Sequence, residues 1–328
     1  MSHPTVSIIM SVYNGEQYLS IAIDSILNQT FTDFEFVIIN DYSTDQSKAI
    51  IQSYADERIV YLENEKNIGL AASLNKGIAI AKGKYIARMD DDDVAFPERL
   101  QRQVAFLEEN REIGLLGTYA EIGGKQTGLR KHSEYSDELK VRTFFSCQFC
   151  HPTVMIRKEV LDQNNLRYNE AFSTAQDYDL WSRMLKCTDF ATLPDVLLKY
   201  RTHDKQVSVS KRQLQIEATT DIYEQMVSSL NLQFTEEMKM LHRKVAVFQF
   251  LQAKQDVPKI GDYFQQLIEA NNKLDVFPKL YFARFLSEYY YNIVNKTETH
   301  KLLRLKLYSP FFQSYFYPYL GKIKQLLK

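Results

Sequence analysis

Residues 88–93 read Arg-Met-Asp-Asp-Asp-Asp and directly follow the apolar, β-prone segment 84–87, so four consecutive aspartates, Asp90 to Asp93, come just after it. Two like charges about 4 Å apart repel by roughly 4 kcal/mol at an effective dielectric near 20. Aspartate also disfavours strand interiors, so the run is expected to form a loop whose carboxylates converge on a cation. We therefore interpret the run as the site of a divalent metal ion that brings a substrate phosphate with it, with a solvated acidic loop as the alternative.

Strands and helices alternate in the residues that lead up to this acidic run. Apolar, largely β-branched runs predict four strands, at residues 6–12, 34–39, 59–62 and 85–87. Apolar side chains at i, i+3 and i+4 spacing predict three intervening helices, around residues 18–27, 45–54 and 70–81. Continuous apolar strands that alternate with amphipathic helices indicate a mostly parallel sheet covered on both faces.

Polar clusters follow three of these predicted strands. Tyr13 and Asn14 follow the first strand, Asp41 follows the second, and the acidic run follows the fourth. In open α/β sheets, ligands bind beyond the carboxyl ends of the strands. We therefore expect the three clusters to share one edge of the sheet and to form one crevice.

The rest of the chain changes character along its length. Short strands at 113–116, 153–156 and 196–200 and a helix at 177–185 complete the α/β part, and helical patterns dominate from about residue 211. We expect two domains, an α/β domain at 1–210 and a helical region at 211–328. Among the local signals, Pro97 suits the first position of a helix, and Ser43 or Thr44 suits a helix cap.

The composition argues against several classes of protein. The net charge of −1 gives no general reason to expect nucleic acid as a partner. No run approaches 18 consecutive apolar residues, the first residues do not resemble a signal peptide, and three cysteines do not make a disulfide framework. These features predict a cytoplasmic protein.

Four motifs occur in the order that is typical of one family. The first is "VSIIMSVYNGEQYLSIAIDSILNQTFTDFEFVIINDYSTDQS", and the second is "NIGLAASLNKGIAIAKGKYIARMDDDDVAFPERLQRQVAFLE". The third is "AQDYDLWSRML", and the fourth is "YRTHDKQVSVS". Over roughly residues 4–210 the chain resembles a family 2 glycosyltransferase of the GT-A type. The resemblance implies a GT-A fold and an inverting, metal-dependent transfer of a sugar from a nucleotide donor, with Mg²⁺ or Mn²⁺ as cofactor. The implied acceptor is a glycan or a lipid-linked sugar.

The resemblance also implies roles for single residues of the donor side. Asp92 would ligate the metal, Asp90 would contact the donor ribose or a metal-bound water, and His203 would approach the metal or the diphosphate. Asp41 would hydrogen-bond the nucleotide base, usually uracil. Four further residues would line the base pocket: Ser11, Tyr13, Asn14 and Glu16. Arg88 would either pair with the diphosphate or balance the acidic run.

On the acceptor side, the resemblance makes Asp177 the candidate general base, which an inverting transfer needs opposite the leaving group. Asp179 is the competitor, although the motif favours a role in bracing the loop. Trp181 would pack in the core or form a platform for an acceptor sugar. The alternatives for the whole protein are a nucleotidyltransferase and a sugar-nucleotide-binding protein without activity.

Two further patterns carry separate interpretations. Cys147, Cys150 and His151 match a haem-attachment pattern, but that chemistry needs export, so we interpret both cysteines as small buried residues. After Glu298 the chain has no acidic residue, and its lysines and arginine alternate with leucines and aromatic side chains. Such a segment suits an anionic membrane surface, which would place the protein on the inner face of the cell membrane. A helix docked on the catalytic domain is the alternative.

Overall fold

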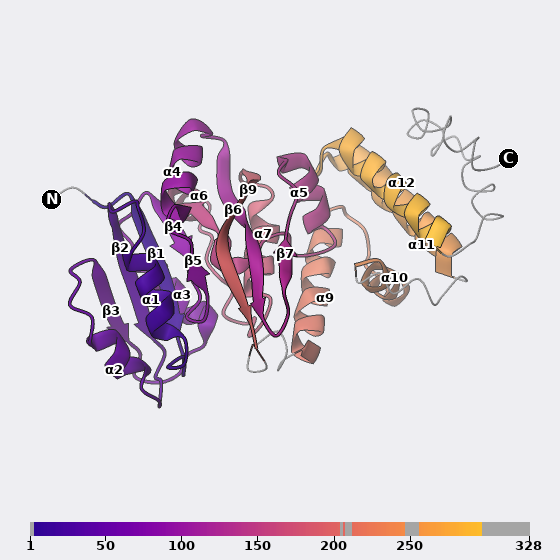
Figure 1. Cartoon of the computed structure of the whole chain (residues 1–328). Coiled ribbons are helices and arrows are strands. Elements are labelled where there is room, and N and C mark those ends of the chain that lie inside the picture. Colours follow the sequence, from indigo (N-terminus) through magenta and orange to yellow (C-terminus); the bar gives the residue numbers. More distant parts are fainter. Residues whose placement is uncertain (1–2, 204–205, 207–211, 247–255, 297–328) are drawn as a thin grey trace. The chain divides into compact units, whose positions relative to one another are not determined.

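The computed structural model describes residues 3–203, 206, 212–246 and 256–296 (Figure 1). Within these residues, helices flank one nine-stranded sheet. The strands are β1 (Val6–Val12), β2 (Phe34–Asn40), β3 (Ile59–Glu63), β4 (Tyr85–Arg88), β5 (Val94–Ala95), β6 (Ile113–Gly124), β7 (Gly128–Arg130), β8 (Met155–Arg157) and β9 (Asp189–Thr202). The helices are α1 (Leu19–Leu27), α2 (Ser47–Gln52), α3 (Leu70–Ile80), α4 (Arg99–Glu109), α5 (Ser136–Thr143), α6 (Lys158–Gln163), α7 (Gln176–Met184), α9 (Arg212–Ser228), α10 (Glu236–Ala246), α11 (Val257–Leu274) and α12 (Lys279–Lys296).

The strand order in the sheet is β3-β2-β1-β4-β8-β6-β9-β5, with β7 paired to β6. The first four strands are all parallel, as their alternation with helices predicted. β8 then runs antiparallel to both β4 and β6, so the second half of the sheet is mixed. Because β2, β1 and β4 are neighbours in this order, their carboxyl ends lie side by side at one edge.

Both faces of the parallel half are covered, which explains why its strands read as continuous apolar runs. One face of β1 and β2 packs in a core with apolar side chains of α1, α2 and α4. The other face packs in a second core with side chains of α3, α6 and α7. The helices therefore flank the sheet on two sides, and the loops at its carboxyl edge are left to form the site.

Two helix starts differ from the sequence-based expectation. α2 starts at Ser47 rather than behind Ser43 or Thr44, because the Ser43 hydroxyl accepts a hydrogen bond from the Asn14 N–H instead (3.1 Å). α4 starts at Arg99, so Pro97 lies before the helix and not at its first position. The residue before Pro97 is still bonded to β9, since the Phe96 N–H donates to the Leu197 carbonyl at 3.0 Å.

β6 and β9 are much longer than the short strands that their apolar runs predicted. They pair in parallel, with shifts of register along the way, until Gly124 lies opposite Thr202. β9 also pairs with β5, which directly follows the acidic run. This pairing carries the end of β9, and His203 directly after it, to the acidic loop.

The described chain separates into two compact units. Residues 3–139 and 147–219 form the α/β unit, and residues 140–146 and 220–296 form a helical unit. In the helical unit, the segment 140–146 contributes Phe144 and Phe145 to an aromatic cluster around His242 of α10. None of the described helices is both long and apolar enough to cross a membrane. The basic and aromatic tail after Glu298 lies outside the described residues.

Candidate functional site

The loops that follow β1 and β2 are tied to each other at the carboxyl edge. The Asp41 N–H donates to the Val12 carbonyl (2.8 Å), and the Asn14 side-chain oxygen accepts from the Thr44 N–H (2.8 Å). The Glu16 carboxylate accepts a hydrogen bond from the Gln46 N–H (2.9 Å). Asn14 and Glu16 therefore shape this pair of loops, in addition to any contact that they make with a ligand.

Ser11 and Tyr13 lie on either side of the last residue of β1. Ser11 is half-buried and pairs with Ile39 in the sheet, whereas the Tyr13 side chain is 52% exposed. Tyr42, which the sequence interpretation did not single out, is equally exposed at the end of β2 and has a φ of 63°. A positive φ is unusual for a bulky residue and costs about 1–3 kcal/mol, so the surrounding hydrogen bonds must hold this loop in place.

Asp41 has a structural role that the sequence did not suggest. It is 2% exposed, and its Oδ1 accepts hydrogen bonds from the Asn64 side chain and the Ile68 N–H (both 2.8 Å). Its Oδ2 accepts from the Gly69 N–H at 2.9 Å. The carboxylate thus braces the loop that leads into α3, and Oδ2 retains capacity for one further donor.

Backbone and side-chain contacts fix the acidic loop from three sides. The Met89 N–H donates to the Ile9 carbonyl of β1 (3.1 Å), and the Arg99 guanidinium donates to the Arg88 carbonyl (2.7 Å). On the side of the first loop, a Cβ added at Gly15 would lie only 2.3 Å from Oδ2 of Asp91. Any side chain at position 15 would therefore displace Asp91, so the first loop and the acidic loop are in close contact.

The third side is formed by the residues at the end of β9. The Arg201 N–H donates to Oδ1 of Asp93 (2.8 Å), and its side chain donates to the Asp92 carbonyl (2.8 Å). The Arg201 guanidinium also lies over the Tyr18 ring, 4.3 Å from its centre, and His203 packs on the same ring at 5.6 Å between centroids. Tyr18, directly before α1, thus joins the first loop to the end of β9.

Asp90, Asp92 and Asp93 form the one group of at least three potential metal ligands within the described residues. Each offers one carboxylate oxygen, and these oxygens lie within 4.8 Å of one another. Asp93 is 1% exposed, whereas the side chains of Asp92 and His203 are 22% and 23% exposed, with Nε2 of His203 2.9 Å from Oδ2 of Asp92. The accessible ligands are therefore Asp92, His203 and, next to them, Asp90.

The electrostatics of this loop favour a bound cation. Burial, together with the charges of Asp92 and Asp90, raises the pKa of Asp91 to about 8. Burial likewise raises the pKa of Asp90 and of Asp93, and Oδ2 of Asp93 is buried without a hydrogen-bond partner. A divalent cation among these oxygens would stabilise the ionised carboxylates, and carboxylate oxygens are the ligands that Mg²⁺ and Mn²⁺ prefer. The residues present fit such an ion.

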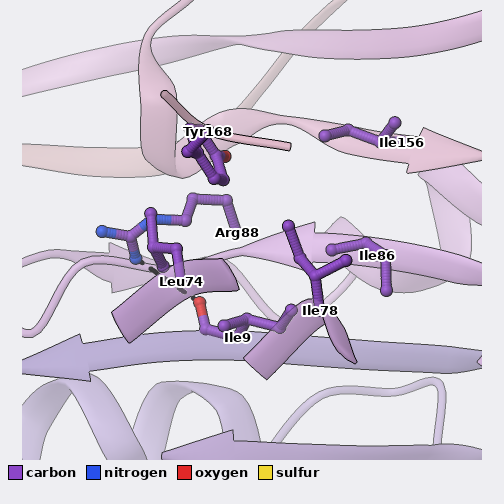
Figure 2. Close-up of a pocket in the computed structure, with 7 residues that line it drawn as sticks. All are labelled: Ile9, Leu74, Ile78, Ile86, Arg88, Ile156 and Tyr168. Carbon is purple, nitrogen blue, oxygen red and sulfur yellow. Dashed lines mark hydrogen bonds between the residues drawn. The ribbon is translucent and has the colours of Figure 1, made fainter. Parts of the chain in front are cut away.

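Arg88 is a buried counter-charge of the acidic loop. Its side chain is 4% exposed and forms an ion pair with Asp90. Among the described residues that line a small pocket with otherwise mainly apolar walls, Arg88 is the one charged residue. Its Nη1 lies 3.4 Å from the Ile9 carbonyl. Figure 2 shows Arg88 between Ile9 and Tyr168. This geometry favours the balancing role over direct pairing with a diphosphate.

Asp177 lies in the first turn of α7, where it is the one partly accessible residue between buried neighbours. Burial raises its pKa, while backbone N–H groups of Tyr178 and Asp177 and the Cys147 thiol oppose that rise. The negative charge of Asp177 in turn raises the pKa of Asp90. Asp177 and the acidic loop therefore belong to the same site, although about 85 residues separate them in the sequence.

Asp179, the competitor of Asp177, and Trp181 both have structural roles in α7. Asp179 is buried, and its Oδ2 accepts two hydrogen bonds from Arg183 at 3.0 and 2.6 Å. Trp181 is fully buried and meets Phe149 and His151 edge to face. Trp181 is therefore a core residue and not an acceptor platform.

Four residues of the site carried no signal that the sequence interpretation used. Tyr18 was counted with the apolar stripe of the first predicted helix. Arg99 and Tyr42 were not singled out: Arg99 is the first residue of α4, and Tyr42 follows Asp41 in the loop after β2. Cys147 belonged to a motif that was set aside, yet its sulfur lies 3.7 Å from Oδ2 of Asp177. Tyr18 and Cys147 act through contacts between segments that are distant in the sequence.

Comparison with known proteins points to one family. A model of glycosyl transferase family 2 matches residues 7–165. An uncharacterised glycosyltransferase of Methanocaldococcus jannaschii is 38% identical over 224 residues, which cover 65% of this chain and 77% of the relative. The O-antigen biosynthesis glycosyltransferase WbnJ of Escherichia coli is 35% identical over 215 residues, which cover 62% of this chain and 82% of WbnJ.

Solved structures agree in fold. TarS 1–349 of S. aureus in complex with UDP-GlcNAc has a TM-score of 0.62 at 19% identity, over 91% of this chain and 92% of its own. The mannosyltransferase PcManGT from Pyrobaculum calidifontis, in complex with GDP-Man and Mn²⁺, has a TM-score of 0.56 at 14% identity, over 96% and 84%. The predicted GT-A fold is confirmed. From its motifs, its relatives and its fold together, the chain belongs to glycosyltransferase family 2.

Proposed function

We propose that this chain is an inverting glycosyltransferase of the hexosyltransferase type, which moves a sugar from a UDP-linked donor to a glycan or lipid-linked acceptor. The observation that carries the proposal is the joint placement of Asp90, Asp92 and His203 with a second, partly accessible carboxylate, Asp177. The name of WbnJ supports a place in surface polysaccharide biosynthesis. The UDP-GlcNAc bound to TarS supports a UDP-sugar as donor.

On the donor side, Asp92 and His203 would hold Mg²⁺ or Mn²⁺, and the Mn²⁺ present in PcManGT supports this assignment. When bound, the ion neutralises the negative charge that develops on the departing diphosphate. Asp90 contacts the donor ribose or a water on the ion. The nucleotide base lies against the loops that follow β1 and β2. There Tyr13 offers its exposed ring, and Oδ2 of Asp41 can accept a hydrogen bond from one more N–H group. Three further residues line this pocket: Ser11, Asn14 and Glu16.

On the acceptor side, Asp177 is the general base. The acceptor hydroxyl oxygen attacks C1 of the donor sugar, and its proton passes to the Asp177 carboxylate as the new C–O bond forms. The bond between C1 and the phosphate oxygen breaks, and its electron pair leaves with the nucleoside diphosphate. Attack from the side opposite the leaving group inverts the configuration at C1.

The acceptor also suggests a location. For a lipid-linked acceptor, the proposal places the enzyme in the cytoplasm at the inner face of the membrane. The basic and aromatic residues after Glu298 support attachment to anionic lipid. Co-sedimentation of the purified full chain with anionic vesicles at low salt tests this part, and protein that stays in the supernatant contradicts it.

A panel of UDP-sugars with Mn²⁺, followed by UDP release, tests the activity. Asp177→Asn is expected to lower turnover by about 10²–10⁴-fold while donor binding by calorimetry is retained. Asp137→Asn is the matched control, since Asp137 also lies in the first turn of a helix and is exposed. Full turnover of Asp177→Asn contradicts the base assignment. Release of pyrophosphate from a nucleoside triphosphate would instead favour a nucleotidyltransferase, and donor binding without turnover a non-catalytic protein.

A further inference from the structure

Cys147 lies directly against the carboxylate that we assign as the general base. Its Sγ is 3.7 Å from Oδ2 of Asp177 and 3.4 Å from the Phe149 carbonyl. Cys147 comes from the segment that follows α5, whereas Asp177 comes from the start of α7, so the tertiary fold creates the contact. Both side chains are partly accessible, and the thiol is not enclosed in a core as the sequence interpretation assumed.

The thiol remains protonated in this position. Burial raises the pKa of Cys147 well above its ordinary value, and the neighbouring charge of Asp177 raises it further. A neutral thiol has one hydrogen to donate, and the carbonyl and the carboxylate compete for it. A hydrogen bond to a charged acceptor is the stronger kind, so donation to Asp177 prevails when that carboxylate is ionised.

We propose, on the basis of the function proposed above, that Cys147 is a positioning residue for the general base: its thiol donates to Asp177, fixes the carboxylate rotamer and favours its ionised form. A base must be ionised before the acceptor hydroxyl can give up its proton. Cys147 itself does not contact the reacting atoms. Its effect on the reaction is transmitted entirely through Asp177.

Other groups face Asp177 and set the background against which the thiol acts. Arg88 of β4 favours the ionised carboxylate. Asp90 of the acidic loop carries a charge of the same sign, and Tyr168, in the segment before α7, is also coupled to Asp177. The N–H groups at the start of α7 donate to the carboxylate as well. Among these groups, the Cys147 side chain donates a hydrogen bond without carrying a charge. Its substitution therefore removes one hydrogen bond to Asp177 and leaves every charge around Asp177 in place.

The test compares the pH dependence of kcat/KM for UDP release with the UDP-sugar that the panel identifies. Cys147→Ala removes the donor, so the acid limb is expected to move to higher pH by about 0.5 unit. Cys147→Ser keeps a donor and is expected to return the limb towards the wild-type position. Cys187→Ala is the matched control, because the Cys187 thiol contacts the Arg183 carbonyl and not the site. A Cys147→Ala profile that coincides with wild type overturns the proposal.

A second measurement does not depend on turnover. Coupling between two sites is reciprocal, so Asp177 must also affect the thiol. At a fixed, mildly alkaline pH, alkylation of Cys147 by iodoacetamide, followed over time by mass spectrometry of its peptide, is expected to be about tenfold faster in Asp177→Asn, because loss of the carboxylate charge lowers the pKa of the thiol by about one unit. The Cys187 peptide from the same sample serves as the internal reference. An unchanged Cys147 rate contradicts the contact.

The two proposals fail in different ways. If Asp177→Asn retains turnover, Asp177 is not the general base, and the proposed positioning role of Cys147 is refuted with it. If Asp177→Asn is inactive while Cys147→Ala and wild type share one pH profile, the base assignment stands and only the role of Cys147 is refuted.

Discussion

Nε2 of His203 lies 2.9 Å from Oδ2 of Asp92, across 111 residues of sequence. The pairing of β9 with β5 and β6 brings the two side chains together, since it carries the end of β9 to the acidic loop. Two partly accessible ligand atoms at this distance can both be within reach of one ion. The relationship makes the closing motif of the family part of the proposed metal site.

Asp92→Asn is therefore expected to weaken Mn²⁺ binding in the presence of UDP on the order of 100-fold, because it removes a ligand and not merely a group that orients one. Isothermal titration calorimetry measures the affinity directly, and removal of metal with a chelator should abolish UDP release by the wild-type protein. Asp137→Asn is the matched control, since it removes a carboxylate charge at an exposed position outside the ligand cluster. Equal losses in both variants would show that net charge alone governs binding.

The Tyr18 ring is expected to support donor binding through Arg201 and His203. Tyr18→Leu removes the ring under the Arg201 guanidinium, an interaction worth about 0.5–2 kcal/mol, so the KM for the donor should rise by about 2- to 30-fold. Tyr18→Phe keeps the ring and should stay near the wild-type value. Initial rates at varied donor concentration decide between them, and a Leu variant with unchanged KM would contradict the role.

The sequence predicted the parallel half of the fold well because its signals are local. Continuous apolar runs and i, i+3, i+4 spacing gave β1 to β4 and the three intervening helices within a few residues. The lengths of β6 and β9 were underestimated, because their pairing depends on partners far along the chain and their outer halves are only partly apolar.

Prediction of the candidate site has the same limit, because contacts between distant segments are not visible in the sequence. The carboxyl-edge rule placed Asp41 and the acidic run at one edge, and the family motifs supplied Asp177 and His203. The buried state of Asp41 and the contact between Cys147 and Asp177 could not be read from either source. Both depend on which side chains of distant loops come into contact. Neither the spacing of apolar residues nor a family motif predicts those contacts.

The α/β unit should be sensitive to a side chain at Gly83. A Cβ there would lie 2.5 Å from the Ser7 backbone nitrogen and 2.7 Å from the Val6 carbonyl carbon, so the chain before β4 would be pushed away from β1. Gly83→Ala is expected to lower the free energy of unfolding by about 1–3 kcal/mol. Urea unfolding followed by the fluorescence of Trp181, the single tryptophan, measures it.

Gly128→Ala is the matched control for that experiment, because a Cβ at Gly128 meets no atom within 4 Å. Its unfolding free energy should stay within about 0.5 kcal/mol of wild type. A Gly83→Ala variant as stable as the control would show that β1 and the chain before β4 can separate without cost.

His242 should make the stability of the helical unit depend on pH. It is fully buried, with Nδ1 2.7 Å from the Tyr263 hydroxyl and Nε2 3.0 Å from the Phe144 carbonyl. Burial lowers its pKa to about 3, although the Phe144 carbonyl opposes the shift. An unfolded histidine has a pKa near 6.5, so above that pH both states are neutral and the contribution is constant. As the pH falls below 6.5, only the unfolded state gains the proton, and stability is lost progressively towards pH 3.

At pH 5 this linkage removes about 2 kcal/mol of stability relative to pH 7.5, a loss of about 1.4 kcal/mol for each pH unit below 6.5. His242→Gln cannot titrate, so its unfolding free energy should fall by about 2 kcal/mol less than that of wild type over the same interval. Urea unfolding of both proteins at the two pH values, followed by far-UV circular dichroism, measures how much the unfolding free energy of each protein changes with pH. The comparison holds even if the glutamine variant is less stable at every pH, because only the change with pH is compared. Parallel losses in the two proteins would show that His242 is not kept neutral by the fold.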